Sequence, residues 1–154
     1  MDNNSNIRGG KVIQYDCNTG SRVKKPHNRI NWMHKVLNLK KITLNQCLFG
    51  LHLINETSSL KYVCIVESEK TAIAMSIFLP NYIWMATGSK SAFKETLLQP
   101  IKNKQIIACP DKSVYEDWSL KAEKLNKNGC SIIVNPIMEN SQSSDGDDFV
   151  DILL

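Results

Sequence analysis

The feature that most constrains the fold is a short apolar run that ends abruptly in charged residues and then turns helical. Val63–Val66 is apolar and mostly β-branched, which is typical of a strand buried on both faces. Glu67 ends this run, and residues 71–79 repeat apolar side chains at helical spacing, with Ser68 as the expected N-cap. A carboxylate at the carboxyl end of a buried parallel strand lies where open α/β sheets bind ligands. Glu67 is therefore the first candidate site residue.

The same alternation of strand and helix continues along the chain. Strands are expected at 62–67, 82–87, 104–111 and 130–134, and helices at 69–79, 91–98 and 114–126. Pro80, Pro100 and Gly129 follow the three helices as stop signals. Successive strand–helix units imply right-handed crossovers. The expected fold class is α/β, with a four-stranded parallel sheet that is flanked by helices.

The first part of the chain has a different pattern, which predicts a small β-hairpin subdomain. Residues 11–16 and 21–24 flank Cys17–Gly20, whose Asn and Gly favour a turn. An isolated hairpin is marginally stable, so residues 44–54 are expected to form a short helix or strand that packs it onto the main body. The expected organisation is a disordered tail at 1–9, a basic hairpin subdomain at 10–58 and an α/β domain at 59–154.

The charge is distributed unevenly between these parts. Residues 1–50 hold nine Lys and Arg against two Asp, whereas residues 51–154 hold ten Lys and Arg against thirteen Asp and Glu. A basic front on an acidic body predicts that the front contacts a polyanion. Cations bind phosphates and an indole ring can stack on a base, so the candidate contacts are Lys24, Lys25, Arg29 and Trp32. In the alternative, Trp32 fills a core and the cations are solvated.

Composition excludes several other classes of protein. A hydrophobic content of 42% and a charged content of 22% are typical of a globular chain. No apolar run reaches the roughly 20 residues that span a bilayer, and the N-terminus lacks the apolar core of a signal peptide. A cytoplasmic protein without a membrane partner is expected. Five scattered cysteines without a CxxC pair predict reduced, structural thiols.

A second carboxylate follows an apolar run in the same way as Glu67 does. Asp111 ends the third expected strand, and Asp145, Asp147 and Asp148 follow the fourth strand and could reach the same edge. In a parallel sheet these side chains would share one edge and repel one another. Mg²⁺ binds one or two carboxylates together with waters and phosphate oxygens, so it is the expected counter-ion. In the alternative, each carboxylate caps a helix or faces water, and Glu69 and Lys70 are solvated charges.

Several motifs resemble the Toprim fold, which bacterial primases, topoisomerases and nucleases of the overcoming-lysogenisation-defect type share. The main ones are Val63–Glu67 followed by Glu69–Ala72, and Ile106–Asp111. The sequence resembles more closely the Toprim-like domain of uncharacterised, primase-related proteins of bacterial mobile elements. That similarity covers nearly the whole chain from about residue 10 and also includes Tyr15–Gly20, Asn31–His34, Phe49–Leu53, Trp84–Gly88 and Asp147–Val150.

The resemblance implies roles for the two carboxylates. Glu67 matches the glutamate proposed to handle protons in phosphoryl transfer, and Asp111 matches the first aspartate of the Mg²⁺-binding Asp-x-Asp motif. Two positions depart from the pattern: Ser68 replaces a frequent Gly, and Ser113 replaces the second aspartate. Loss of that carboxylate should weaken Mg²⁺ binding unless Glu69, Asp117 or Asp147 substitutes for it.

The resemblance also implies a function and partners. We expect a Toprim-like, nucleic-acid-associated protein related to DNA primases, with weak or no catalysis of its own. Single-stranded DNA is the expected partner, with Lys70 and Lys112 beside the carboxylates as further contacts, and replication or mobilisation proteins could join it. Two alternatives stay open: an active Mg²⁺-dependent nuclease or primer-synthesising primase, and a non-catalytic protein-interaction module.

Overall fold

The computed structural model describes residues 1–55 and 62–152, which divide into two compact units. One unit comprises residues 7–46, and the other comprises residues 1–6 together with the chain from Cys47 onward. The expected domain boundary at residue 58 lies outside the described residues. Residues 1–6 are folded back on themselves, because the Asp2 carboxylate accepts hydrogen bonds from the backbone N–H groups of Asn4 and Asn6, each at 2.9 Å.

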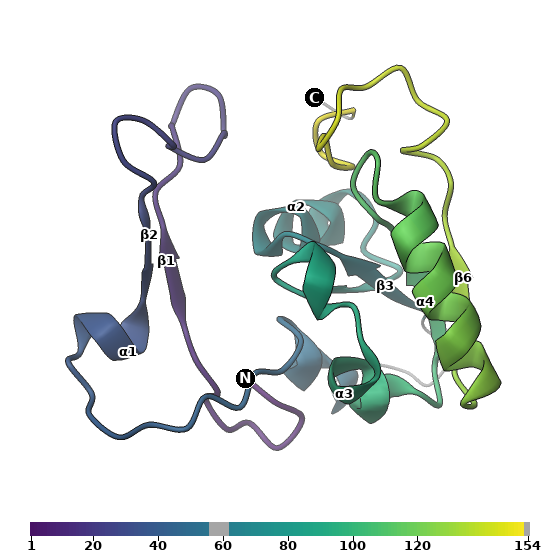
Figure 1. The fold of residues 1–154 in the computed structure, drawn as a ribbon, viewed down its shortest axis with the longest axis horizontal. Coiled ribbons are helices and arrows are strands. Elements are labelled where there is room, and N and C mark those ends of the chain that lie inside the picture. The colour runs from purple at the N-terminus through teal and green to yellow at the C-terminus, as the bar shows by residue number, and fades with distance from the viewer. Residues whose placement is uncertain (56–61, 153–154) are drawn as a thin grey trace. The chain divides into compact units, whose positions relative to one another are not determined.

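A four-stranded parallel sheet forms the centre of the larger unit (Figure 1). Its strands are β3 (Val63–Val66), β4 (Ile83–Ala86), β5 (Gln105–Ala108) and β6 (Ser131–Val134). Their order across the sheet is β4-β3-β5-β6, and all three pairings are parallel. The expected α/β class with four parallel strands is confirmed.

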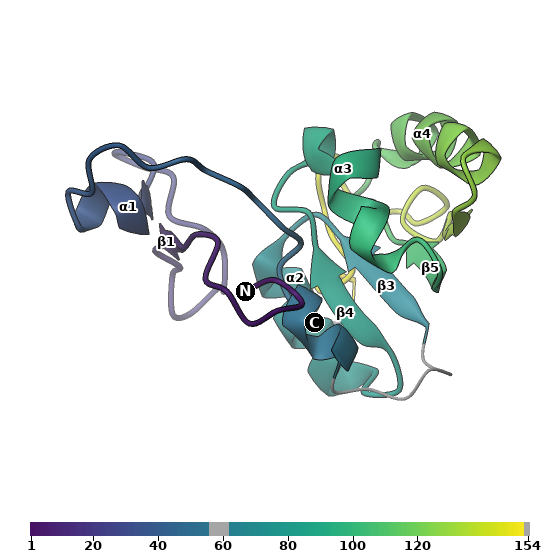
Figure 2. The same ribbon diagram turned by 90° about the horizontal axis from the view of Figure 1, so that it is seen from below.

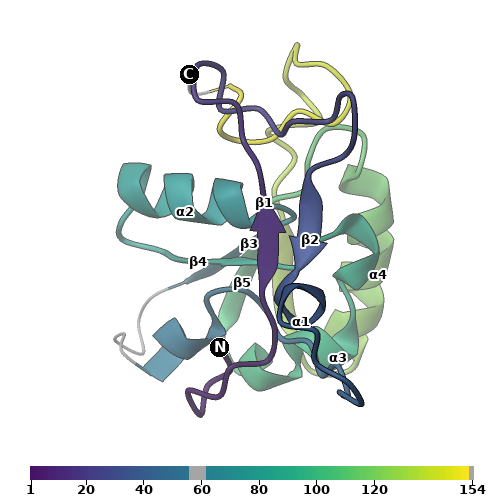
Figure 3. The same cartoon turned by 90° about the vertical axis from the view of Figure 1, so that its left-hand side faces the viewer.

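Helices cover both faces of this sheet. They are α2 (Glu69–Phe78), α3 (Glu95–Leu98) and α4 (Tyr115–Lys127), with short 3₁₀ turns η2 (Lys90–Ala92) and η3 (Gln99–Ile101). Because β4 and β5 lie on opposite sides of β3, right-handed crossovers put α2 on one face and α3 and α4 on the other. Figure 2 shows α3 and α4 together on one side of the sheet, and Figure 3 shows α2 and α4 on opposite sides of β3.

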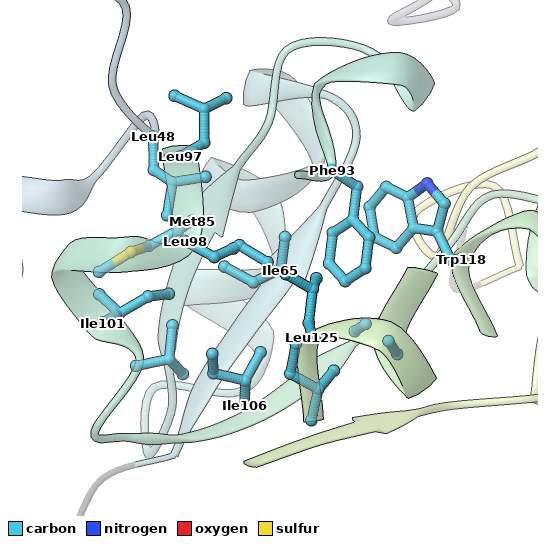
Figure 4. Close-up of a cluster of buried hydrophobic side chains, with 14 of the residues drawn as sticks. Leu48, Ile65, Met85, Phe93, Leu97, Leu98, Ile101, Ile106, Trp118 and Leu125 are labelled. Carbon is cyan, nitrogen blue, oxygen red and sulfur yellow. The ribbon is translucent and has the colours of Figure 1, made fainter. Parts of the chain in front are cut away.

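The core on the α3 and α4 side is built around two aromatic rings. Phe93 and Trp118 are fully buried and stack with ring centroids 4.2 Å apart and an interplanar angle of 8° (Figure 4). The indole Nε1–H donates to the carbonyl of Lys90 at 3.3 Å, which satisfies the polar group of Trp118. The single helix expected at 91–98 is wrong: the chain is extended at Phe93 (φ −72°, ψ 90°), between η2 and α3, where the ring enters this core.

The opposite face is covered by α2 and by the chain after β6. Cys64 and Val66 of β3 and Met75 of α2 lie in one buried cluster with side chains from the C-terminal stretch, namely Met138, Phe149 and Val150. All five cysteines are free thiols, and two of them, Cys64 and Cys109, are buried. The C-terminal stretch is therefore part of the fold and is held against the sheet.

Residues before β3 close the outer edge of β4. Phe49 forms an antiparallel bridge with Ala86, and the 3₁₀ helix η1 (Leu51–Asn55) follows. Gly50 allows this approach: its φ is +82°, and a Cβ there would lie 2.9 Å from the carbonyl oxygen of Trp84. The element expected at 44–54 is therefore a bridge followed by a short helix.

The smaller unit holds a two-stranded antiparallel sheet of β1 (Lys11–Ile13) and β2 (Ile30–Trp32), followed by α1 (Met33–Val36). The expected turn forms, since Tyr15 bridges Arg22 and the Asp16 carboxylate accepts from the backbone N–H groups of Asn18 and Thr19. The sequence did not predict that β1 pairs mainly with β2, which requires residues 24–28 to loop out between Val23 and Arg29. Among the described residues, no helix is long and apolar enough to cross a membrane.

Removal of the Trp118 ring should destabilise the larger unit strongly. We expect Trp118→Ala to lower the free energy of unfolding by about 3–5 kcal/mol, because it leaves a cavity against Phe93. On the same helix Leu120 is 60% exposed, and Leu120→Ala should cost less than about 0.5 kcal/mol. Urea unfolding followed by circular dichroism measures both. Equal losses for the two variants would contradict this packing.

Candidate functional site

Two carboxylates meet where the order of the sheet reverses. The chain passes from β3 to β4 on one side and then crosses to β5 on the other side of β3. Glu67 directly follows β3, and Asp111 follows β5 by three residues. In open α/β sheets the carboxyl ends of the two strands at such a switch point border the ligand-binding crevice. The topology therefore brings the two predicted carboxylates to one place.

The Glu67 carboxyl group is partly withdrawn from water. Burial raises its pKa above the usual value, while the Lys90 ammonium and the backbone N–H of Lys90 oppose that rise. One of its oxygens, Oε1, is buried and has no hydrogen-bond partner among the described residues. A buried carboxylate oxygen without a donor is costly and suits a proton or a cation. Glu67 is thus poised to bind a positive ligand.

The Asp111 carboxyl group is perturbed more strongly than Glu67. Burial and the charges of Glu67, Asp148 and Asp151 raise its pKa to about 8, and the Lys70 ammonium counteracts them. At neutral pH most of the protein therefore carries a proton on Asp111. A divalent cation would favour the ionised form by supplying the charge that a single lysine does not.

Two acidic neighbours act on Asp111: Asp148, which the sequence placed among the carboxylates that could reach this edge, and Asp151, which the sequence did not single out. Asp148 is buried, accepts a hydrogen bond from the Thr71 hydroxyl, and accepts from the backbone N–H of Val150 at 2.8 Å. Its backbone N–H donates to the Asp151 carboxylate at 2.9 Å. The apolar pair Phe149-Val150, which follows Asp148, enters the core and draws Asp148 inward.

The predicted Asp147 has a different environment. Its carboxylate accepts from the backbone N–H of Ser144 at 2.7 Å, and its carbonyl accepts from the backbone N–H of Lys112 at 2.9 Å. The Lys112 ammonium donates to the carbonyls of Glu139 and Ser141 at 2.7 and 3.0 Å. Lys112 therefore fastens the C-terminal stretch to the loop after β5.

Ser113, at the position where the motif has its second aspartate, also contacts the C-terminal stretch. It has a positive φ of 68°, which is uncommon for a residue other than glycine. Its hydroxyl donates to the Asp145 carboxylate at 2.5 Å, and its backbone N–H donates to the Glu139 carboxylate at 3.1 Å. Lys112 and Ser113 thus hold the loop after β5 against the C-terminal stretch.

Three lysines act on the carboxylate pair: Lys70 on Asp111, and Lys90 and Lys121 on Glu67. Lys70, which the sequence predicted, is half-buried in the first turn of α2 and acts on Asp111. Lys90, which the sequence did not indicate, is exposed in η2 and acts on Glu67. The Lys90 carbonyl accepts from Trp118, and Lys121 of α4 pairs with Asp117 at 2.7 Å. Only the tertiary fold brings η2 beside the end of β3, so no local pattern marks Lys90.

The remaining predicted contacts belong to the smaller unit. Lys24, Lys25 and Arg29 are exposed, and Trp32 is half-buried. The Lys11 ammonium lies 5.7 Å from the centroid of the Trp32 ring, a cation–π distance. These residues therefore belong to a different unit of the chain from Glu67 and Asp111.

The carboxylate pair fits a Mg²⁺ ion by the chemistry of its donors. In residues 1–55 and 62–152, no three His, Cys, Asp or Glu side chains form a group that could hold a metal ion. Mg²⁺ commonly takes only one or two carboxylates and completes its shell with waters and substrate phosphates. The unpartnered Oε1 of Glu67 and the raised pKa of Asp111 match that requirement.

Residues 1–112 match the model of a protein family whose description is "Domain of unknown function (DUF6371)". This match spans β1 to β5 and includes both Glu67 and Asp111. No curated protein and no solved structure matches the chain.

Ionisation of Asp111 should make the stability of the protein depend on pH. Because the folded pKa of about 8 lies above the unfolded value, the folded protein holds a proton that the unfolded chain loses above about pH 4. Stability therefore falls as pH rises from about 5 to about 8. Wild type should lose on the order of 2 kcal/mol more than Asp111→Asn over this range, as measured by urea unfolding without divalent cations.

The matched control is Glu123→Gln, which changes an exposed carboxylate of α4. This variant should follow the wild-type pH profile. A profile for Asp111→Asn that runs parallel to wild type at every pH would show that Asp111 ionises normally.

Proposed function

The chain belongs to the DUF6371 family, and we propose that it is a Toprim-like, nucleic-acid-associated protein related to DNA primases, with weak or no catalysis of its own. The observation that carries this proposal is the pair Glu67 and Asp111 at the switch point of a parallel sheet. Two carboxylates there, each with a raised pKa and each with at least one lysine nearby, suit a site that handles phosphate through a divalent cation.

In this proposal Glu67 and Asp111 hold Mg²⁺, which would polarise a phosphoryl oxygen when bound. Lys90 and Lys70 stand beside the two carboxylates and can pair with phosphate oxygens. Lys24, Lys25 and Arg29, all exposed, supply the contacts to the nucleic-acid backbone. Weak catalysis follows from Ser113, because its hydroxyl is bound to Asp145 and offers no charged ligand to the ion.

One observation favours the second candidate, an active Mg²⁺-dependent nuclease or primase. Glu67 has a raised pKa and a buried oxygen without a partner, which are properties of a general acid or base. In such an enzyme Glu67 would carry the proton that leaves the attacking hydroxyl. Asp111, closer to the additional charges of Asp148 and Asp151, would then be the main ligand of the ion.

Binding of Mn²⁺, as a stand-in for Mg²⁺, should release a proton. At pH 7 the Asp111 carboxyl group is mostly protonated, so a cation that binds its ionised form should displace close to one proton per ion. Calorimetric titrations in two buffers of different ionisation enthalpy measure this number. Glu67→Gln should weaken binding about tenfold or more and release fewer protons, because the Glu67 charge no longer raises the pKa of Asp111.

Glu123→Gln is again the control and should bind Mn²⁺ as wild type does. The proposed cation site is refuted if wild type takes up no Mn²⁺ at millimolar concentration, or if both variants bind it equally well.

Labelled single-stranded DNA separates the candidate functions. We expect the full chain to retain the DNA at low salt and, with Mn²⁺ and nucleotides, to yield little or no cleaved or extended product. Products that disappear in Glu67→Gln but persist in Glu123→Gln would instead favour the active enzyme. Failure to retain DNA even at low salt would favour the protein-interaction module, because backbone contacts strengthen as salt is lowered.

A further inference from the structure

Residues 7–46 form a compact unit that has no buried core of its own. Every residue between Ile7 and Gln46 is exposed or half-buried. Val36 and Leu37, at the end of α1, are 54% and 58% exposed. The larger unit, in contrast, contains two clusters of buried apolar side chains. Since burial of apolar surface is the main favourable term in folding, two short strands without it are marginally stable.

The unit is also strongly basic. It contains nine Lys and Arg and one Asp, a formal charge of +8, whereas the rest of the chain has a formal charge of −4. So many like charges repel one another and oppose compaction until anions neutralise them. This charge is complementary to a polyanion, and a phosphate backbone supplies regularly spaced negative charges.

One face of its small sheet offers a surface on which a base can stack. Lys11 lies opposite Trp32, and Ile13 lies opposite Ile30, so these four side chains share a face. The His34 ring lies 6.2 Å from the Trp32 ring. The face thus combines an aromatic platform with an adjacent cation, the two elements that single-stranded nucleic acids need from a protein.

The loop between Val23 and Arg29, which carries Lys24 and Lys25 and is called the cationic loop, is joined to the same sheet by backbone hydrogen bonds. The Gln14 N–H donates to the Arg29 carbonyl at 3.0 Å, the Arg29 N–H donates to the Val23 carbonyl at 3.3 Å, and the Val23 N–H donates to the Gln14 carbonyl at 3.0 Å. These bonds continue the β1–β2 pairing toward Lys24 and Lys25. Figure 1 shows β1 and β2 side by side, with loops at the end that leads away from α1. Phosphate groups that bind the loop would therefore also stabilise the pairing of β1 with β2.

We propose that residues 7–46 are a single-strand nucleic-acid-binding module whose sheet becomes stably ordered only when the nucleic acid is bound. Bases stack on Trp32, and phosphates neutralise the loop cations Lys24, Lys25 and Arg29. The ligand thereby supplies both the buried surface and the opposite charge that the unit lacks. This inference rests on the proposed function only in requiring that the chain binds single-stranded nucleic acid, and it adds that binding and ordering are coupled in this unit.

Hydrogen exchange on the full chain tests the coupling directly. With an oligothymidine of about 20 nucleotides at low salt, the exchange rates of the β1 and β2 amides should fall by a factor of about ten or more. The amides of β3 and β5 should be protected equally in both states, which makes them an internal control. The proposal is overturned if β1 and β2 are as protected as β3 without DNA, or if bound DNA leaves them unprotected.

Two triple variants test where the DNA binds. Lys24→Ser/Lys25→Ser/Arg29→Ser should weaken binding strongly and reduce the slope of log affinity against log salt by about 2, at about 0.7 per contact for single strands. The control, Lys94→Ser/Lys124→Ser/Lys127→Ser, removes three exposed cations of the larger unit and should change the affinity less than threefold. Trp32→Ala should weaken binding without changing the salt slope. Equal losses for the two triple variants would overturn the assignment.

The outcomes separate this inference from the proposed function. If the full chain binds no oligonucleotide at low salt, the proposed function fails and the inference fails with it. If the oligonucleotide binds but leaves residues 7–46 unchanged, only the inference fails. Glu67→Gln/Asp111→Asn should retain the protection of β1 and β2. Protection that appears with rising protein concentration and without DNA would identify a second copy as the partner and overturn the inference.

Discussion

The pairing of β3 with β5 is the contact on which the larger unit depends. The backbone N–H of Cys109 donates to the carbonyl of Ile65 at 2.7 Å, which continues this ladder one residue beyond the end of β5. Because β4 lies on the other side of β3, this pairing creates the switch point and sends α2 and α4 to opposite faces. It also decides that Glu67 and Asp111 share an edge, although 43 residues separate them in the chain.

The proximity of these carboxylates has an energetic consequence. Two partly buried like charges cannot both stay ionised without a compensating positive charge, and Lys70, Lys90 and Lys121 only partly supply it. The fold resolves the conflict with a proton on Asp111, which a divalent cation can replace. The strand order thus creates a repulsion between Glu67 and Asp111, and this repulsion would favour binding of a divalent cation.

Patterns along the sequence predicted most helices and strands of the larger unit. The features that they did not predict depend on contacts between distant parts of the chain. The β-branched run at Val63–Val66 predicted a buried strand, and the repeated strand–helix pattern predicted the parallel sheet. Strand order, the place of Lys90 and the pairing of β1 with β2 depend on segments that meet only in the fold. Asp148 rather than Asp147 acts on Asp111, because the apolar residues after it anchor it.

The proposed site depends on the electrostatic interaction between Glu67 and Asp111. Titration of the Asp111 side-chain carboxyl carbon by NMR, without divalent cations, tests this interaction. Asp111 should titrate with a pKa of about 8 in wild type and at a clearly lower pH in Glu67→Gln. A carboxyl carbon that titrates near pH 4, the ordinary range of an aspartate, in both proteins would contradict it.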